Sequence, residues 1–125
     1  MGFQECDDIN RILSDSSLQS TYDNFNGGHA VAIAWRKDVW EKVFAESKEV
    51  AEDRKDQWYG KRVVVYGRFK NIKTGQTAFF MNLHGPLPVD TGGQCGGEAL
   101  AYNLLKVIGT MANKEDLLIL VGDFN

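Results

Sequence analysis

The stretch LLILVGDFN, residues 117–125, decides how the rest of this sequence is interpreted. Its first five residues are apolar without interruption, which predicts a strand covered on both faces. Gly122 ends the run, and Asp123 and Asn125 follow at the carboxyl end of the strand, where α/β sheets place their ligands. On an extended backbone these two side chains point the same way. They could hold a hard metal ion, orient water or contact a phosphate; the alternative is an ordinary strand-end turn, which both residue types favour.

The overall composition is that of an ordinary globular domain. The chain has 125 residues, of which 43% are hydrophobic and 25% charged, and we expect one domain or part of one. With 14 basic and 17 acidic residues the net charge is −3, so a polyanionic partner would need a local basic patch or a metal ion. Cys6 and Cys95 are far apart and are expected to be free thiols.

The sequence contains no feature that places it in a membrane or in a particular compartment. No segment approaches the roughly 20 apolar residues of a transmembrane helix. The start, MGFQEC, has neither a basic nor an apolar signal region. Nothing indicates an obligate protein partner, and the localisation is left open.

The hydrophobic pattern predicts a mixed α/β chain. Two strands, Arg62–Phe69 and Thr77–Leu83, should form an antiparallel hairpin around Gly75, and Ala30–Trp35 is a third strand. A short helix should follow the N-cap residues Asp7 and Asp8, and Glu98–Ala112 should be a longer one because its apolar residues recur every three or four positions.

Two regions are harder to interpret. Asp38–Glu52 is charged and only partly periodic, so we expect a short helix or an irregular segment. The mixed charges of Glu41–Lys61 favour a solvated face. The Gly- and Pro-rich stretch Gly85–Gly97 should be a loop.

Three motifs in a fixed order identify a known pattern: GFQEC at residues 2–6, NLHGP at 82–86 and VGDFN at 121–125. AIAWRKDVW at 32–40 and RVVVYGRF at 62–69 agree with it, as does a helix between the second and third motifs. Together they resemble the endonuclease/exonuclease/phosphatase superfamily, with its deoxyribonuclease-I-like fold. The resemblance covers nearly the whole chain and implies the α/β (α+β) class, as part of a four-layer α/β/β/α sandwich.

The resemblance also implies a chemistry and a set of site residues. It implies Mg²⁺-assisted hydrolysis of a phosphodiester or phosphomonoester, with Mn²⁺ as a second candidate ion, and one Glu suffices because Mg²⁺ keeps several waters. The resemblance implies that Glu5 binds the metal and that Gln4 supports it. Asp123 would orient or deprotonate the attacking water, and Asn125 would contact a phosphate oxygen or position Asp123. His84 would act near the leaving oxygen, and Arg62 would contact the phosphate. Taken without the family, Glu5 could simply be a carboxylate near a helix N-terminus, and His84 could simply end a strand.

The sequence also departs from the family pattern. The family domain begins with a strand carrying an Asn of the metal site, and it continues past Gly-Asp-Phe-Asn to a catalytic Asp and a terminal Ser-Asp-His. Residues 1–125 contain neither part, and His29 lies near the place of a Glu that the nuclease branch pairs with its first His. We therefore expect residues 1–125 to be a partial domain, truncated at both ends, in which Leu117–Val121 exposes one side and an unpaired edge.

These expectations give a functional hypothesis. The parent protein would be a Mg²⁺-dependent, nuclease-like phosphodiester hydrolase, and the LHGP stretch at residues 83–86 favours nucleic acid as its substrate. The 125-residue chain itself is expected to have little or no turnover. The alternatives are a non-catalytic binding or scaffold domain of the same fold, and a phosphoinositide or sphingomyelin phosphoesterase, because fold does not fix function.

Overall fold

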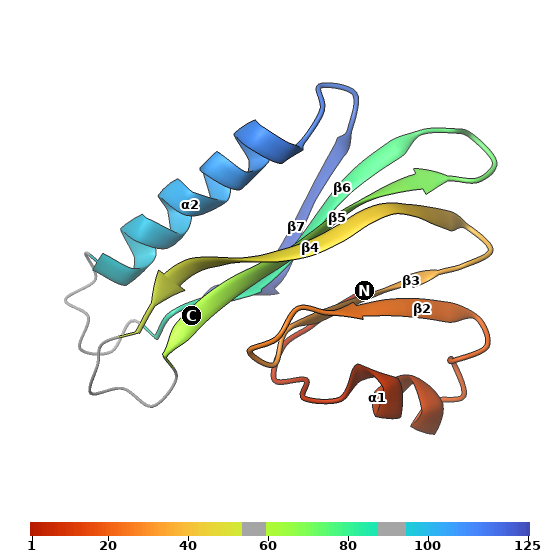
Figure 1. Ribbon diagram of the computed structural model, residues 1–125, viewed down its shortest axis with the longest axis horizontal. Coiled ribbons are helices and arrows are strands. Elements are labelled where there is room, and N and C mark those ends of the chain that lie inside the picture. The colour runs from red at the N-terminus through yellow and green to blue at the C-terminus, as the bar shows by residue number, and fades with distance from the viewer. Residues whose placement is uncertain (54–59, 88–94) are drawn as a thin grey trace.

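The protein is a sandwich of two β-sheets covered by a helix on each outer face (Figure 1). The computed structural model describes residues 1–53, 60–87 and 95–125, the last range without the side chains of residues 95–98. The first sheet has the strand order β1-β3-β2, and the second has the order β4-β5-β6-β7. The bounds are β1 (Gly2–Phe3), α1 (Ile9–Asp15), β2 (Tyr22–Asn26), β3 (Ala32–Arg36), β4 (Trp40–Glu52), β5 (Lys61–Asn71), β6 (Thr77–His84), α2 (Cys95–Met111) and β7 (Leu117–Asp123). The predicted α/β class and α/β/β/α layering are confirmed.

Each space between neighbouring layers has its own apolar core. Ile9 and Leu13 of α1 pack on Ala32 and Ala34 of the first sheet. The core between the sheets and the core under α2 divide the residues of β5 by their parity, because successive side chains of a strand point to opposite faces. Val63, Val65 and Phe69 face the first sheet, whereas Val64 and Tyr66 face α2, together with Phe79, Met81 and Leu83 of β6. A strand apolar on both faces therefore lies at the centre of the sandwich.

The predicted β5–β6 hairpin and both predicted helices are confirmed, but α2 begins at Cys95, inside the predicted loop Gly85–Gly97. Residues 88–94 of that loop lie outside the described residues. The hairpin strands pair antiparallel, with Val64 opposite Leu83 and Lys70 opposite Thr77. Helix α1 begins after Asp8, whose carboxylate accepts a hydrogen bond of 3.0 Å from the backbone N–H of Arg11. The short strands β1 and β2 were not predicted, because neither shows a sustained alternation of apolar residues.

The expectation of a helix or an irregular segment over Asp38–Glu52 is wrong. All but its first two residues form β4, which pairs antiparallel with β5 along its whole length. The register shifts between Lys42 and Phe44 and again between Glu49 and Ala51, so the period-2 pattern of a strand is interrupted twice. Pairing with a central strand overrides the weak local preference of this charged segment.

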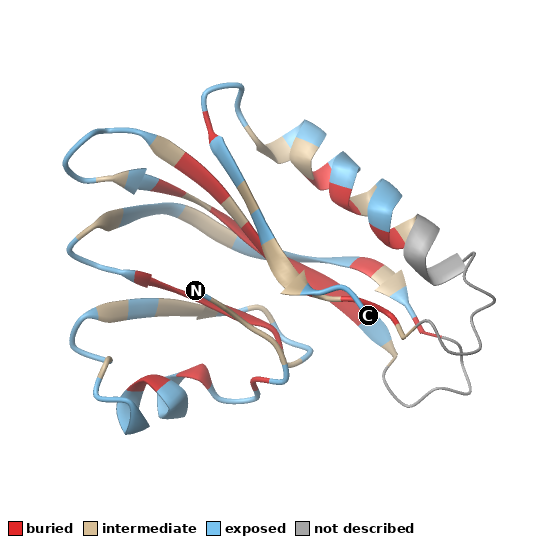
Figure 2. Cartoon of the chain, turned by 180° about the vertical axis from the view of Figure 1, so that it is seen from behind, coloured by how far each residue is buried: buried red, intermediate tan, exposed pale blue. Residues whose placement is uncertain are grey.

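Strand β7 lies at the edge of the second sheet. It pairs in parallel with β6, where Phe80 lies beside Ile119. Helix α2 packs against β4, the strand at the opposite edge of this sheet. Leu117, Leu118 and Leu120 are therefore 50%, 52% and 40% exposed. Figure 2 shows β7 from behind, with mostly exposed and intermediate residues along it. Within the described residues β7 is therefore not covered on both faces. It has the exposed side and the unpaired edge that the sequence analysis expected for the partial domain.

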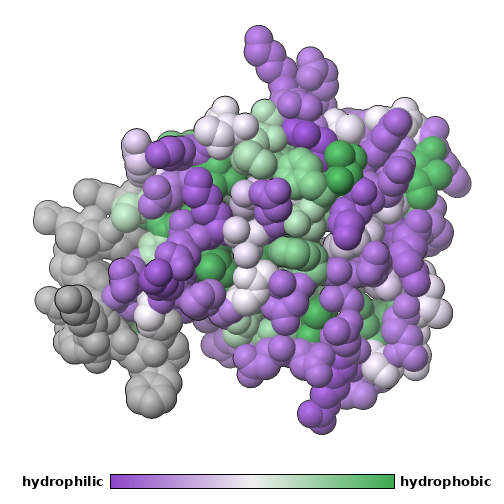
Figure 3. Space-filling view, in the orientation of Figure 1, coloured by the Kyte–Doolittle hydropathy of each residue, from purple (hydrophilic) through white to green (hydrophobic). Residues whose placement is uncertain are grey.

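The molecular surface is mixed in character. Figure 3 shows hydrophilic side chains over most of one face, with apolar groups showing between them. Neither helix in the described part of the chain is long and apolar enough to span a bilayer.

Candidate functional site

One end of the sandwich holds a polar cavity of about 420 Å³. It lies where β1 and β6 end and where β3 and β5 begin, so that residues distant in sequence meet there. Three predicted site residues line it, namely Glu5, Arg62 and His84. Asp7, His29, Ala30 and Lys61 complete the lining.

Asp123 reaches the same end because β6 and β7 are parallel neighbours. His84 and Asp123 lie side by side in the register, and His84 Nε2 is 4.0 Å from Asp123 Oδ2. The histidine side chain is 14% exposed and the aspartate 53%. An imidazole shielded by the protein therefore lies beside a carboxylate that solvent or a substrate can reach.

Two glycines allow the ends of these strands to approach closely. Gly122 has φ +148°, and a Cβ there would lie 2.3 Å from the carbonyl oxygen of Leu83. A Cβ on Gly85 would lie 2.8 Å from the carbonyl oxygen of Phe124. Larger residues at either position would push Asp123 away from His84.

Asn125 is held to Asp123 and to the strand beside it. Its backbone N–H donates to Asp123 Oδ1 at 3.0 Å, and its side-chain amide donates to the carbonyl oxygen of Gly85 at 2.8 Å. The contacts fit the positioning alternative for Asn125, because its NH₂ group is already engaged with Gly85 and its backbone fixes the carboxylate of Asp123.

The two residues before Glu5 are held by a buried asparagine that sequence reasoning did not single out. The side-chain amide of Gln4 donates to Asn82 Oδ1. Asn82, fully buried on β6, donates in turn to the carbonyl oxygens of Phe3 at 3.0 Å and Ala32 at 2.9 Å. Asn82 thereby joins β6 of the second sheet to β1 and β3 of the first, next in sequence to the segment that carries Glu5. Its signal in the sequence was a polar residue inside the apolar strand TAFFMNLH.

Arg62 is fixed by a second residue that the sequence did not reveal. Its Nε donates to Asp53 Oδ2 at 2.7 Å, and both side chains are nearly inaccessible. Asp53 Oδ1 also accepts a bond of 3.3 Å from the backbone N–H of Leu87. Asp53 belongs to the stretch predicted to be a solvated face, and that prediction is wrong here because the buried guanidinium requires a buried counter-charge.

Comparison with known proteins identifies the architecture. No family model matches the sequence, and no curated protein matches it. Among solved structures, an endonuclease/exonuclease/phosphatase family protein from Bacteroides thetaiotaomicron is similar, with a TM-score of 0.70 and 21% identity over 92% of this chain and 46% of that one. The chain has the endonuclease/exonuclease/phosphatase fold.

Two other structures with this fold match as well. The mannosyl-6-phosphatase Bt3783 of B. thetaiotaomicron VPI-5482 gives a TM-score of 0.75 at 22% identity, over 99% of this chain and 50% of that one. D. rerio TDP2 complexed with a single-strand DNA product gives 0.72 at 16% identity, over 97% and 45%. The chain thus spans about half the length of these structures.

Few of the described side chains at the polar cavity could act as ligands of a magnesium ion. Among the described residues, no group of three or more His, Cys, Asp or Glu is placed to share a metal ion. The carboxylate of Glu5 borders a cavity large enough for several waters and a phosphate. Mg²⁺ is commonly held by one or two carboxylates, water and substrate phosphate, so the oxygen ligands present fit that ion.

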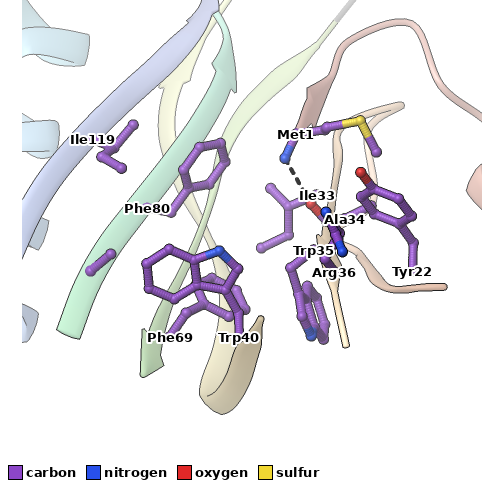
Figure 4. A pocket seen from close by; sticks show the side chains of 11 residues that line it. Met1, Tyr22, Ile33, Ala34, Trp35, Arg36, Trp40, Phe69, Phe80 and Ile119 are labelled. Carbon is purple, nitrogen blue, oxygen red and sulfur yellow. Dashed lines mark hydrogen bonds between the residues drawn. The ribbon is translucent and has the colours of Figure 1, made fainter. Parts of the chain in front are cut away.

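A second cavity, at the opposite end of the strands, is different in character. It has a volume of about 290 Å³ and lies between the two sheets. Figure 4 shows Trp35, Trp40, Phe69 and Phe80 around it, with the amino group of Met1 hydrogen-bonded to Ala34. Burial lowers the pKa of that amino group. This cavity is mainly apolar, so the polar end is the candidate site for phosphate chemistry.

Cys6 follows Glu5 directly in the sequence. It is a free, buried thiol. Burial, together with repulsion from Asp7 and Asp8, raises its pKa, so the thiol stays neutral and is no metal ligand in this state. The side chain of Cys95 lies outside the described residues.

Proposed function

We propose that this chain contributes the metal-binding part of a Mg²⁺-dependent phosphodiester hydrolase site of the nuclease-like kind. One observation carries the proposal: Glu5, Arg62 and His84 line a single cavity, and Asp123 lies 4.0 Å from His84. A carboxylate, a guanidinium, an imidazole and a second carboxylate are the groups that metal-assisted phosphate hydrolysis uses.

Each residue has a role that its contacts permit. Mg²⁺, when bound at Glu5, would neutralise charge that develops on the phosphate oxygens. Asp123 accepts a proton from, or orients, the attacking water, and Asn125 holds its carboxylate. His84 acts near the leaving oxygen. Arg62, whose direction Asp53 sets, faces the cavity as a charged donor for the phosphate.

The proposed substrate class rests on one motif, since the fold alone does not fix it. The solved structures with this fold include a protein named a mannosyl-6-phosphatase and one complexed with a single-strand DNA product. Because the LHGP stretch favours the nuclease branch, we propose nucleic acid over a phosphoinositide or sphingomyelin. The alternative is a non-catalytic binding domain, which the imidazole of His29 at the place of a family carboxylate would favour.

Metal binding by the 125-residue chain tests the site directly. In ¹H–¹⁵N NMR spectra, Mn²⁺ should broaden the amide signals around Glu5 and Asp123, and Mg²⁺ should reverse the broadening by competition. Glu5→Gln should weaken Mn²⁺ binding at least about tenfold, as the loss of a ligating charge implies. Asp15→Asn, which removes an exposed carboxylate from α1, should change nothing. Broadening centred elsewhere, or unchanged in Glu5→Gln, would overturn the proposal.

A turnover assay tests whether the 125-residue chain is catalytic by itself. Because the chain spans about half of the structures that it matches, we expect it alone to cleave bis(p-nitrophenyl) phosphate little or not at all. Mg²⁺-dependent cleavage that disappears in Asp123→Ala would contradict this expectation of inactivity, while supporting hydrolysis as the chemistry of the site.

A further inference from the structure

Unusual backbone conformations gather at the polar cavity. Five non-glycine residues in the described chain have positive φ: Glu5, Ser17, His29, Ala30 and Asn125. Ser17 apart, all lie at or beside the cavity. Left-handed conformations cost free energy for residues with a Cβ and persist where the surroundings impose them, often at functional sites.

The turn that carries His29 is fixed from several sides. Asn26 Oδ1 accepts from the N–H of Gly28 at 2.9 Å, and the N–H of Gly27 donates to the carbonyl oxygen of Val31 at 3.0 Å. The carbonyl oxygen of Ala30 accepts from the N–H of Cys6 at 2.9 Å. That bond ties the His29 turn directly to the segment that carries Glu5, so the two side chains are placed at the cavity together.

Among the cavity's basic groups, His29 differs in its contacts. Lys61 Nζ is 2.9 Å from Glu49, and Arg62 is paired with Asp53. His29 is exposed, and its imidazole has no hydrogen-bond partner among the described residues. Its N–H is therefore available to a molecule that enters the cavity.

Resting on the function proposed above, we propose that His29 is a substrate-positioning residue that donates an imidazole hydrogen bond to a non-bridging phosphate oxygen. Glu5 and His29 would then approach a phosphate from adjoining backbone segments. A residue whose only task was to make the turn would be better chosen as glycine, which adopts positive φ without a steric penalty and already occupies the preceding position, 28.

The positive φ of His29 allows an experiment in which one substitution should lower phosphate affinity without lowering the stability of the protein. His29→Gly removes the imidazole and also relieves the backbone, so Tm should be unchanged or higher. The affinity for inorganic phosphate in the presence of Mg²⁺, followed by NMR chemical shifts, should fall about tenfold, the worth of one charge-assisted hydrogen bond. Ser17→Gly is the matched control: it relieves the same strain at φ +57° beyond α1 and should leave phosphate affinity unchanged.

A second variant guards against a general disturbance of the turn. His29→Asn keeps an N–H donor and tolerates the left-handed region, so it should retain more phosphate affinity than His29→Gly. Equal phosphate affinity in the native chain and in His29→Gly would overturn the proposal, as would an absence of phosphate binding in the native chain or equal losses in the Gly and Asn variants.

The metal experiment keeps this inference separate from the proposed function. Mn²⁺ broadening around Glu5 should be the same in the native chain and in His29→Gly, because His29 is assigned to phosphate alone. Normal Mn²⁺ binding with no effect of His29→Gly on phosphate would refute the role of His29 and leave the metal site standing. Mn²⁺ binding that is insensitive to Glu5→Gln would instead refute the proposed function.

Discussion

Strand β5 supplies the arginine of an arginine–aspartate ion pair near each of its ends, and the two pairs have different roles. Arg62 pairs with Asp53 at 2.7 Å beside the polar cavity, and Arg68 pairs with Asp116 at 2.9 Å toward the opposite end. In both pairs the aspartate side chain is fully inaccessible. What differs is the surroundings of the arginine, and the surroundings decide whether such a pair only stabilises the fold or also serves a site.

The Arg68 pair is a structural joint. The other arm of the guanidinium donates to the carbonyl oxygen of Met111 at 2.7 Å, at the end of α2. Asp116 also accepts from the N–H of Asn113 at 2.8 Å, and the guanidinium carbon lies 5.3 Å from the ring centre of Phe44. These contacts fasten the turn between α2 and β7 to the middle of the sheet.

The Arg62 pair lies beside the polar cavity. Asp53 holds the guanidinium and the N–H of Leu87, while Arg62 itself lines the cavity. Water in that cavity can solvate part of Arg62 when Asp53 is lost. The comparison therefore predicts a large stability effect at one end of β5, and a smaller one coupled to binding at the other.

Asp116→Ala should give the largest effect. It removes the counter-charge of Arg68, whose side chain is 15% exposed, and frees the N–H of Asn113, so the free energy of unfolding should fall by about 3–5 kcal/mol. Urea unfolding followed by circular dichroism measures it. Exposed Asp15→Ala is the control and should cost less than about 1 kcal/mol. A loss at Asp116 no greater than the control's would show that the Arg68 pair is not a structural joint.

Asp53→Ala should destabilise less and should also weaken binding. We expect a loss of about 1–3 kcal/mol, because the cavity lets water replace part of the lost partner. Arg62 should then turn away from its present direction, and phosphate affinity in the presence of Mg²⁺ should fall about tenfold. Asp116→Asn, assayed under native conditions, should keep its phosphate affinity. Equal losses of phosphate affinity in the two variants would show that the Arg62 pair is no more closely linked to binding than the Arg68 pair.

The sequence predicted much of the fold because the decisive signals are local. The apolar strands, the β5–β6 hairpin and the stripe of α2 are legible in a short window of residues. Neither arginine pair is legible in that way, since Asp53 lies 9 residues from Arg62 and Asp116 lies 48 residues from Arg68. The two irregularities in β4 hid the strand that brings Asp53 to the site.

The candidate site was predictable only as far as its motifs reach. The resemblance pointed to Glu5, Arg62 and His84, and the structure places them around one cavity. It did not single out Asn82, whose importance arises from contacts with β1 and β3. Nor could it reveal the positive φ of His29, because no residue type at that position requires one and the turn is imposed by bonds to Cys6 and within residues 26–31.

The smallest effect that the comparison predicts is a dependence of stability on acid. Burial tends to raise the pKa of Asp116, but hydrogen bonds from Thr77, Asn113 and Arg68, with the charge of Arg68, together lower it. A carboxyl whose pKa is lower in the folded state stabilises the fold above its unfolded pKa, near 4, and loses that contribution as pH falls through the folded value. Below about pH 4 the native chain should therefore lose stability more steeply than Asp116→Asn, by at most about 1.4 kcal/mol per pH unit, the slope of one proton. Urea unfolding of both chains across pH 2–6 measures the difference. Parallel curves would show that the pKa of the Asp116 carboxyl is the same in the folded and unfolded states, contrary to what the Arg68 pair requires.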